Sequence, residues 1–320
     1  MKMDIVACTD KWFVMPTGVM MYSVCVNNPD MDIVFHVITD DCVTDDDKND
    51  LEDIVVSFKR KSIVFYPVSE SIKNNCFPAL EKTHLTEVTY YRLWLTKILP
   101  NTIDKILYLD GDIIVRHSLL SLWNTDLEGY ALAAVADCME GNIEYYNRLG
   151  YPSQYGYFNA GALLINLKYW RENGVLKVFS DYISNYSANI KYHDQDILNV
   201  LFRNCKIVLP LKYNLSTGFL YKTPYYDYRK YKDEIMEARM NPDVLHFSTS
   251  EKPWHVYQRY PHPYSSTWYK YQNRTKWKDV KYEHRPFRLR IINFVADTLR
   301  RWKLKPQITM YDFIDIAPID

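Results

Sequence analysis

Short apolar runs alternate with segments of helical periodicity through the first third of the chain, and this alternation limits the fold more than any other feature. It predicts strands over 3–8, 32–38, 62–67 and 105–109 and helices over 16–27, 44–58 and 86–99. Thr44, with Asp47 three residues later, is typical of a capping box. Because helical crossovers join parallel neighbours, we expect an α/β protein with a parallel central sheet.

The remainder of the chain is less regular. Strands are predicted over 131–135 and 158–166, and helices over 175–186 and 195–202, after which Pro, Tyr and charged residues dominate. With 320 residues, 48% of them hydrophobic, the chain can bury a core without disulfides or metals. Its 6 cysteines form no C-x-x-C pair, so neither a zinc site nor a disulfide framework is indicated.

Charge is balanced in total but divided along the chain. The 39 Lys and Arg residues offset 39 Asp and Glu residues, which argues against nucleic acid as a partner. Residues 268–305 nevertheless hold 12 bases and 3 acids. We therefore expect a catalytic domain over 1–267 and a basic, aromatic extension over 268–320. The N-terminus lacks a charged leader with an apolar core, and no run reaches the ~20 apolar residues of a membrane span, so we expect a cytoplasmic location.

Carboxylate pairs of the form Asp-x-Asp occur at 30/32, 45/47, 110/112 and 194/196. The first precedes a strand and the second lies in the first turn of a helix, where acids are commonly structural. Asp110 and Asp112 differ because the run ILYLDGDIIV has apolar residues on both sides, and buried charges are costly unless they are paired or bind a metal. They also end a parallel strand, where open α/β sheets bind ligands. A solvated acidic turn is the alternative.

A divalent cation held by one or two carboxylates completes its shell with phosphate oxygens and water. Such a site favours a nucleotide or a phosphorylated substrate. Neither G-x-x-x-x-G-K-[ST] nor G-x-G-x-x-G occurs, so the sequence supports neither a P-loop nor a dinucleotide-binding fold. The chemistry that fits is the metal-assisted departure of a diphosphate, as in sugar transfer from a sugar nucleotide.

Seven sequence blocks occur in the order seen in family 8 glycosyltransferases: MDIVACTDKW, TYYRL, ILYLDGDIIV, FNAGALLINLKYWR, HDQDILN, LKYN and LHFSTSEKPW. Across residues 3–260 the chain resembles bacterial galactosyl- and glucosyltransferases of lipopolysaccharide and capsule assembly. The resemblance implies a GT-A fold with a Rossmann-like, mostly parallel sheet. It also implies a UDP-hexose donor, Mn²⁺ (or Mg²⁺) as cofactor, and retention of anomeric configuration.

The resemblance further implies that Asp110, Asp112 and His246 hold the metal. A mixed set of oxygen and imidazole ligands suits Mn²⁺. Lys252 would meet the donor diphosphate as a point charge. Considered alone, His246 is a packed histidine in a short strand, and Lys252 is an exposed lysine.

Further matched positions are implied to bind the donor between its base and its sugar. They are Ala7, Thr9, Asp10, Trp12, Arg92, Gly111, Asn159, Ala160, Gly161 and Thr249. Trp12 offers a face for uracil, and Arg92 would reach the sugar and phosphates, although a lone helical arginine is more often a surface residue. Thr9 stands where many relatives have an acid, and Thr249 where a glycine often lets the backbone approach the diphosphate. A Cβ at position 249 would push that loop outward unless φ is negative.

Asp194 and Gln195 match the catalytic pair that touches the sugar near its anomeric carbon. Because Gln195 is a poor nucleophile, we expect front-face departure, in which the leaving UDP oxygen helps to activate the acceptor hydroxyl. A double displacement through Asp194 stays open. The structural alternative for both residues is a helix N-cap.

Apolar residues between 287 and 302 recur at helical spacing among arginines, which predicts a basic amphipathic helix. One interpretation is a peripheral contact with anionic lipid on the inner face of the cytoplasmic membrane, close to a lipid-linked acceptor. Basic, aromatic tails of similar bacterial enzymes support it. The alternative is that the apolar face packs on the catalytic domain.

These features predict a retaining, Mn²⁺-dependent hexosyltransferase that uses UDP-galactose or UDP-glucose to extend a surface glycan or lipid-linked saccharide. One rival is a glycogenin-like priming enzyme that glucosylates one of its own 28 Tyr residues. Another is a non-catalytic sugar-nucleotide-binding subunit. The presence of Asp110, Asp112, His246, Asp194 and Gln195 together argues against a binding role alone.

Overall fold

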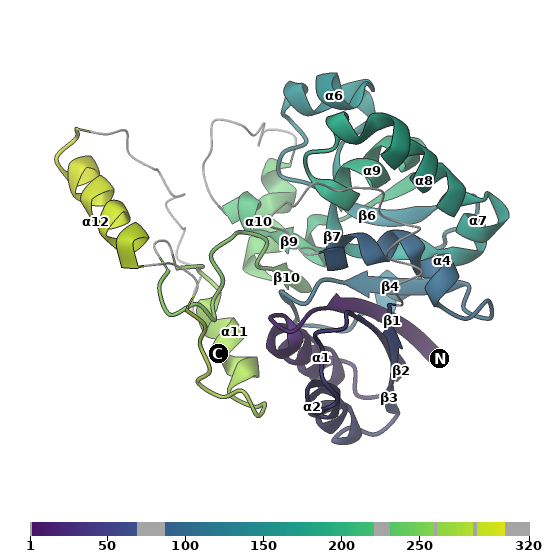
Figure 1. The fold of residues 1–320 in the computed structure, drawn as a ribbon, viewed down its shortest axis with the longest axis horizontal. Coiled ribbons are helices and arrows are strands. Elements are labelled where there is room, and N and C mark those ends of the chain that lie inside the picture. The colour runs from purple at the N-terminus through teal and green to yellow at the C-terminus, as the bar shows by residue number, and fades with distance from the viewer. Residues whose placement is uncertain (1, 69–86, 221–230, 259–260, 284–286, 305–320) are drawn as a thin grey trace.

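A seven-stranded mixed sheet forms the centre of the molecule (Figure 1). The computed structural model describes residues 2–68, 87–220, 231–258, 261–283 and 287–304. In sheet order the strands are β3 (Lys61–Pro67), β2 (Asp32–Thr39), β1 (Lys2–Thr9), β4 (Lys105–Leu109), β7 (Phe158–Asn166), β6 (Leu132–Ala136) and β8 (Lys206–Leu209). All run parallel except β7, which is antiparallel to β4 and β6. The predicted mostly parallel α/β sheet is confirmed.

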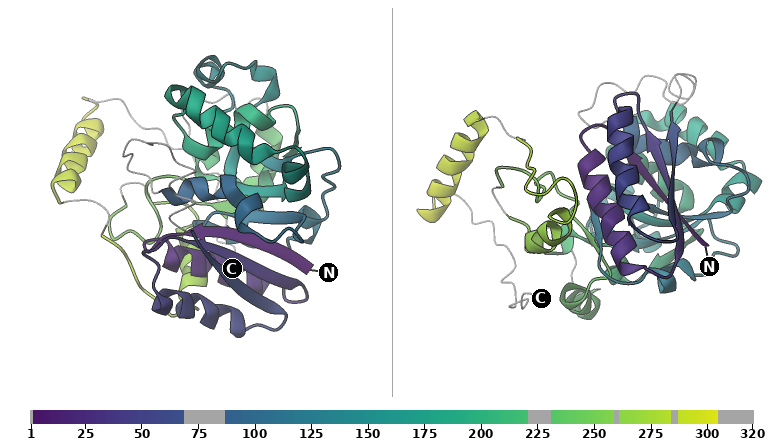
Figure 2. Two further views of the ribbon diagram at one scale, coloured as in Figure 1. Left: turned by 45° about the vertical axis from the view of Figure 1, so that its right-hand side comes forward. Right: turned by 90° about the horizontal axis from the view of Figure 1, so that it is seen from below.

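Helices cover both faces of this sheet (Figures 1 and 2). The α-helices are α1 (Val14–Asn27), α2 (Asp45–Val56), α4 (Leu95–Ile98), α5 (Leu120–Trp123), α6 (Ile143–Leu149), α7 (Leu167–Glu172), α8 (Val175–Tyr186), α9 (His193–Phe202), α10 (Lys232–Met240), α11 (Ser265–Gln272) and α12 (Phe287–Arg301). Short 3₁₀ helices are η1 (Glu87–Trp94), η2 (Ser153–Tyr155), η3 (Ser187–Asn189), η4 (Leu211–Tyr213) and η5 (Thr217–Leu220). The predicted capping box at Thr44 and Asp47 is present at the start of α2.

Alternate residues of β1 enter two different cores. Ile5 and Ala7 join the cluster formed with α1 and α2, whereas Val6 and Cys8 join the cluster formed with η1, α8 and α9. This alternation is the period of two expected for a strand that is covered on both faces. The sheet is therefore the middle of three layers, and its strand ends are left to carry the polar groups.

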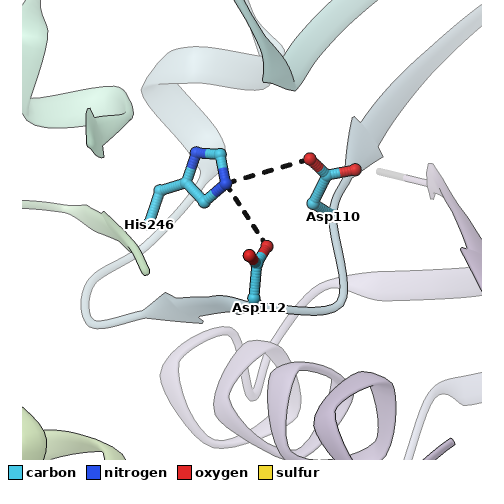
Figure 3. Close-up of side chains that lie close together, drawn as sticks. All are labelled: Asp110, Asp112 and His246. Atoms are coloured by element: carbon cyan, nitrogen blue, oxygen red, sulfur yellow. Dashed lines mark ion pairs between the residues drawn. The ribbon is translucent and has the colours of Figure 1, made fainter. Parts of the chain in front are cut away.

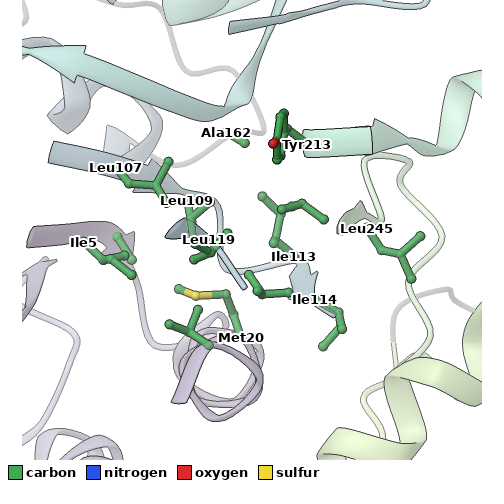
Figure 4. Close-up of a cluster of buried hydrophobic side chains, with 14 of the residues drawn as sticks. Ile5, Met20, Leu107, Leu109, Ile113, Ile114, Leu119, Ala162, Tyr213 and Leu245 are labelled. Atoms are coloured by element: carbon green, nitrogen blue, oxygen red, sulfur yellow. The ribbon is translucent and has the colours of Figure 1, made fainter. Parts of the chain in front are cut away.

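A second, three-stranded sheet adjoins the end of β4. Its order is β5 (Ile113–Val115), β10 (Val244–His246) and β9 (Leu215–Ser216), with β10 antiparallel to β5 and parallel to β9. The pairing sets His246 opposite Ile113, which directly follows the Asp110–Asp112 loop. Figure 4 shows the buried side chains of Leu107, Leu109 and Ile113 on either side of that loop. Their burial anchors both of its ends.

Two of the predicted helices differ in detail from the structure. The helix predicted over 86–99 is the 3₁₀ helix η1 followed by the short α4, and residue 86 lies outside the described residues. Tyr90, Tyr91, Leu93, Trp94 and Leu95 are all buried, so packing on several sides replaces the single apolar face of a regular α-helix. The helix predicted over 195–202 already begins at His193.

Regular structure also continues beyond residue 202, as β8, β9, α10, β10, α11 and α12. The strands among these elements have two to four residues, too few for an alternating pattern to be recognised in a sequence. Among the described residues, no helix has the length and apolarity needed to cross a membrane.

The helix α11 crosses the expected boundary between residues 267 and 268. Trp268 is fully buried, with ring centroids 4.4 Å from Trp254 and 5.5 Å from Phe247. By contrast, α12 stands apart from the sheet and its helices in all three views (Figures 1 and 2). Residues 284–286 and 305–320 of the expected extension lie outside the described residues.

Candidate metal and donor site

The loop between β4 and β5 is held on two sides. The backbone N–H of Asp110 donates to the carbonyl of Gly161 at 2.8 Å, and the backbone N–H of Phe247 donates to the carbonyl of Asp112 at 3.0 Å. The first bond ties the loop to β7 and the second ties it to the residue that follows β10. The two aspartate residues are thereby fixed at the end of β4, as the sequence predicted.

Asp110, Asp112 and His246 converge at this point (Figure 3). One ligand atom from each lies within 4.8 Å of the others. The Nε2 atom of His246 is 3.3 Å from Asp112 Oδ1 and 3.8 Å from Asp110 Oδ2. Two carboxylates and an imidazole that face a common point form a donor set suited to a divalent cation such as Mn²⁺.

Two neighbouring groups keep the buried Asp112 carboxyl ionised. Burial alone would raise the pKa of this carboxyl, but Lys252 and His246 outweigh it and hold the pKa well below the usual range. The Nζ atom of Lys252 lies 2.5 Å from Asp112 Oδ2 and 2.6 Å from the carbonyl oxygen of Phe247. Its side chain is only 13% exposed. Lys252 is thus the counter-ion of Asp112, and the interpretation as an ordinary exposed lysine was wrong.

Arg92 connects the acidic loop to α9. Its Nη2 donates to Asp110 Oδ1 at 2.7 Å, and its Nε lies 3.0 Å from Asp194 Oδ2 in an ion pair. Its Nη1 donates to the carbonyl of Ala160 at 2.6 Å, and the guanidinium stacks 4.2 Å from the centre of the Tyr108 ring. The Arg92 side chain is buried and connects three parts of the site, so the interpretation as a surface arginine was wrong.

Asp194 and Gln195 lie in the first turn of α9. The N-cap of this helix is Tyr192, without a side-chain cap, so the interpretation of the pair as an N-cap was wrong. Burial raises the pKa of Asp194 to about 7, although the nearby Arg92 opposes this effect. Gln195 accepts a hydrogen bond from the backbone N–H of Ala160 at 2.9 Å.

The segment expected to bind uridine lies beside the metal cluster, because β1 pairs directly with β4. Ala7, Thr9 and Asp10 are buried, and Asp10 Oδ1 accepts the backbone N–H groups of Trp12 and Phe13 at 2.9 and 3.0 Å. The Trp12 side chain is 70% exposed, which leaves its indole face open to a ligand. These contacts close the turn into α1 and present Trp12 at the rim.

Two positions show why a particular residue fits. A β-carbon on Gly111 would lie 2.6 Å from Thr17 Oγ1, so the glycine lets α1 pack on the acidic loop. Thr249 does not have a positive φ, and its Oγ1 donates to the carbonyl of Glu251 at 3.1 Å. The backbone at Thr249 is therefore one that a threonine adopts without strain.

Two polar residues of the site were missed from the sequence. Asp137 follows β6 and accepts hydrogen bonds from Asn159 Nδ2 at 2.9 Å and Gln195 Nε2 at 3.3 Å. Asn214 is fully buried and lies 3.0 Å from His246 Nδ1. A signal was available for both, since Asp137 is a carboxylate at the end of a strand, like Asp110, and Asn214 closes the LKYN block.

A mostly parallel sheet with an Asp-x-Asp loop after β4, and with a histidine delivered by a second small sheet, defines a glycosyltransferase of GT-A fold. The chain belongs to glycosyl transferase family 8, whose model matches residues 4–257. The resemblance expected from the seven sequence blocks is confirmed.

Individual relatives agree with this assignment. General stress protein A of Bacillus subtilis is 27% identical over 87% of this chain and 96% of its own length. A lipopolysaccharide 1,2-glucosyltransferase of Escherichia coli K12 is 28% identical over 82% of this chain and 75% of its own. Among solved structures, the galactosyltransferase LgtC in complex with donor and acceptor sugar analogues superimposes with a TM-score of 0.73 at 29% identity. That likeness covers 90% of this chain and 99% of LgtC.

Proposed function

We propose that this glycosyltransferase moves galactose or glucose from a UDP-sugar to a surface glycan with retention of anomeric configuration, and that it depends on Mn²⁺. The observation that carries the proposal is the convergence of Asp110, Asp112 and His246 beside the ammonium of Lys252. The names of the similar proteins, a lipopolysaccharide glucosyltransferase and a galactosyltransferase, support a hexose donor and a glycan acceptor.

The residues around the cluster suit a nucleoside diphosphate. A bound Mn²⁺ would offset the negative charge of the departing diphosphate. Lys252 is paired with Asp112, and it would move to the diphosphate once Asp112 bound a cation. Thr249, three residues earlier, would approach the same phosphates through the loop that follows β10. The indole of Trp12 would stack on uracil, above the turn of Ala7, Thr9 and Asp10.

The opposite side of the cluster would hold the hexose. Ala160 on β7 donates its backbone N–H to Gln195 of α9. Its neighbours Asn159 and Gly161 lie on the other face of the strand, against Asn214 and His246. Asp194 is 3% exposed and paired with Arg92, which makes it a weak nucleophile. Both features support front-face departure over a double displacement. In this scheme the protein contributes orientation and charge stabilisation while the acceptor hydroxyl attacks.

We further propose that residues 1–267 carry catalysis and that the extension over 268–320 attaches the enzyme, through α12, to the inner face of the cytoplasmic membrane, near a lipid-linked acceptor. Six apolar side chains of α12 and its C-terminal flank are at least 49% exposed, and they lie among arginines: Ile291, Ile292, Phe294, Val295, Trp302 and Leu304. None of them belongs to the three hydrophobic clusters of the described core. This combination suits an anionic lipid surface.

Vesicle co-sedimentation tests the membrane proposal with the full chain. We expect Phe294→Glu to bind phosphatidylglycerol vesicles more weakly than the wild type, and Val178→Glu, at an exposed apolar position of α8, to bind as the wild type does. Equal binding by all three proteins would contradict it.

The donor is tested by incubating the purified enzyme with Mn²⁺ and a panel of UDP-, GDP- and ADP-sugars while the released nucleotide is measured. We expect release from UDP-galactose or UDP-glucose alone, and an α-linked product by NMR because these donors are α-linked. Intact-mass analysis in the same reaction detects hexoses added to the chain, as a glycogenin-like enzyme would add. An inverted product, or nucleotide release only from another donor, would contradict the proposal.

A further inference from the structure

A chain of hydrogen bonds between buried polar side chains joins the proposed metal ligand His246 to Asp137. Asp137 follows β6, which pairs with β7 along the edge opposite to β4. His246 Nδ1 is 3.0 Å from Asn214 Oδ1, and Asn214 Nδ2 donates to Asn159 Oδ1 at 2.8 Å. Asn159 Nδ2 in turn donates to Asp137 Oδ2 at 2.9 Å. All four residues are at least nine-tenths buried, so water has little access to these bonds.

The direction of each hydrogen bond follows from the groups that contact the nitrogen and the oxygen of the Asn159 side-chain amide. An ionised carboxylate only accepts, so the amide nitrogen of Asn159 must face Asp137. A backbone N–H only donates, and that of Gly161 lies 2.9 Å from Asn159 Oδ1. Two independent neighbours therefore give the Asn159 amide the same orientation.

The orientation of Asn214 follows from that of Asn159. Its amide nitrogen must point at the Asn159 carbonyl oxygen, which leaves Asn214 Oδ1 against His246. An amide oxygen only accepts, so the imidazole carries its proton on Nδ1. In the neutral imidazole, which is the form that binds a metal, the lone pair of Nε2 then faces Asp110 and Asp112, from which Nε2 is 3.8 and 3.3 Å away.

We propose that Asn214 is a positioning residue that fixes the tautomer and ring orientation of His246 and so prepares Nε2 to bind the cation. The inference rests on the proposed metal site, and it adds a residue that touches neither the cation nor the donor. Histidine ligands generally donate their second ring N–H to such a partner, and loss of that partner weakens metal binding. Asn159 and Gly161, on the donor-sugar side, thereby act on the orientation of the metal ligand.

The plain alternative is that Asn214 only stabilises the fold at the end of η4. This alternative predicts a lower melting temperature with unchanged metal affinity. The two readings are separated by measuring Mn²⁺ affinity without any substrate, from the loss of the free Mn²⁺ EPR signal during titration of the full-length protein. Melting temperatures are recorded on the same samples.

Three variants are compared with the wild type. Asn214→Leu removes the acceptor without leaving room for water, and we expect Mn²⁺ to bind about 10- to 100-fold more weakly. Asn214→Asp keeps an oxygen against His246 Nδ1, and its other oxygen, when protonated, replaces the amide donor to Asn159 Oδ1, so we expect binding close to that of the wild type. The matched control is Asn28→Leu, because Asn28 is also buried but, among the described residues, its side chain bonds the backbone of Val24 and Leu119. It should lower the melting temperature and keep Mn²⁺ affinity.

Wild-type Mn²⁺ affinity in a folded Asn214→Leu protein would overturn the inference while leaving the proposed metal site intact. If the leucine variant does not fold, the aspartate variant decides, and weaker binding than the wild type would overturn the inference. A wild-type protein that binds no Mn²⁺ would instead refute the metal site itself, and with it the role of Asn214.

Discussion

Gly161 lies directly against the ring of His246, on the strand that neighbours the acidic loop. A β-carbon built on this glycine would overlap Cε1 of the imidazole, and it would lie 2.7 Å from Nδ1 and 3.0 Å from Asp110 Oδ2. The absence of a side chain at position 161 therefore creates the space in which the three proposed metal ligands meet.

Gly161→Ala is expected to displace the His246 ring and to weaken Mn²⁺ binding by at least about tenfold, because the new methyl group occupies the ring's position. Equilibrium dialysis with Mn²⁺ measures the effect. The matched control is Gly18→Ala on α1, where the added carbon would overlap the Trp277 ring instead. The control should lose stability but keep its Mn²⁺ affinity, and an unchanged affinity in both variants would show that the space at Gly161 is unimportant.

Arg92→Gln is expected to lower the free energy of unfolding by about 3–5 kcal/mol, because it leaves Asp110 and Asp194 without their buried cation. Urea denaturation measures this loss. Arg171→Gln is the control, since Arg171 pairs with the largely exposed Asp104 at 2.7 Å. Its loss should be much smaller. Equal losses would mean that the central position of Arg92 has no energetic consequence.

Lys252→Met is expected to affect metal and nucleotide in opposite directions. Because the ammonium competes for Asp112, its removal should tighten Mn²⁺ binding in the absence of nucleotide. The same change should weaken UDP binding in saturating Mn²⁺, since a charge that would meet the diphosphate is lost. Calorimetric titration of each ligand checks both effects. Lys212→Met, which breaks another lysine–aspartate pair, should change neither affinity. Tighter UDP binding to the Lys252 variant would contradict the proposed role.

Asp194 should make the metal-free protein less stable as pH rises. Burial raises the pKa of Asp194 to about 7, from an ordinary value of 3.8, so the folded state holds this proton more firmly than the unfolded state. Its contribution to stability is complete below pH 4 and is lost as pH rises towards 7. Between pH 5 and 8, Asp194→Asn should gain about 3 kcal/mol relative to the wild type.

This pH dependence is measured by urea denaturation at both pH values in the presence of EDTA. The control is Asp181→Asn, at an exposed position of α8, for which no comparable relative gain is expected. If the Asp194 variant and the wild type respond equally to pH, the burial of an ionisable Asp194 is refuted.

Much of the fold could be predicted from the sequence, because β1, β2, β4 and the helices between them have regular patterns of apolar residues. The antiparallel direction of β7 was not readable, since a strand buried on both faces shows the same apolar run in either direction. The segment from Glu87 to Trp94 was predicted as an α-helix but is a 3₁₀ helix, because its side chains are packed from several directions.

The residues of the candidate site could be predicted from the sequence where they follow a strand or belong to a block that matches the family. The proposed metal ligands are of this kind, and Figure 3 shows that their side chains lie close together. The chain of hydrogen bonds from Asp137 to His246 was not readable, because each of these bonds joins residues that are 22 to 55 positions apart. Only the pairing of β10 with β5 and β9 brings Asn214 within reach of His246.

The most direct test of the proposed function is UDP release from UDP-galactose and UDP-glucose by the wild type, Asp112→Asn and Asp45→Asn. Asp45 belongs to another Asp-x-Asp triplet, at the exposed start of α2, and serves as the matched control. We expect the wild type and the Asp45 variant to release UDP with Mn²⁺ and to stop in EDTA, and the Asp112 variant to be at least about 100-fold slower. UDP release that persists in EDTA, or an Asp112 variant as fast as the wild type, would contradict a metal-dependent transferase centred on this cluster.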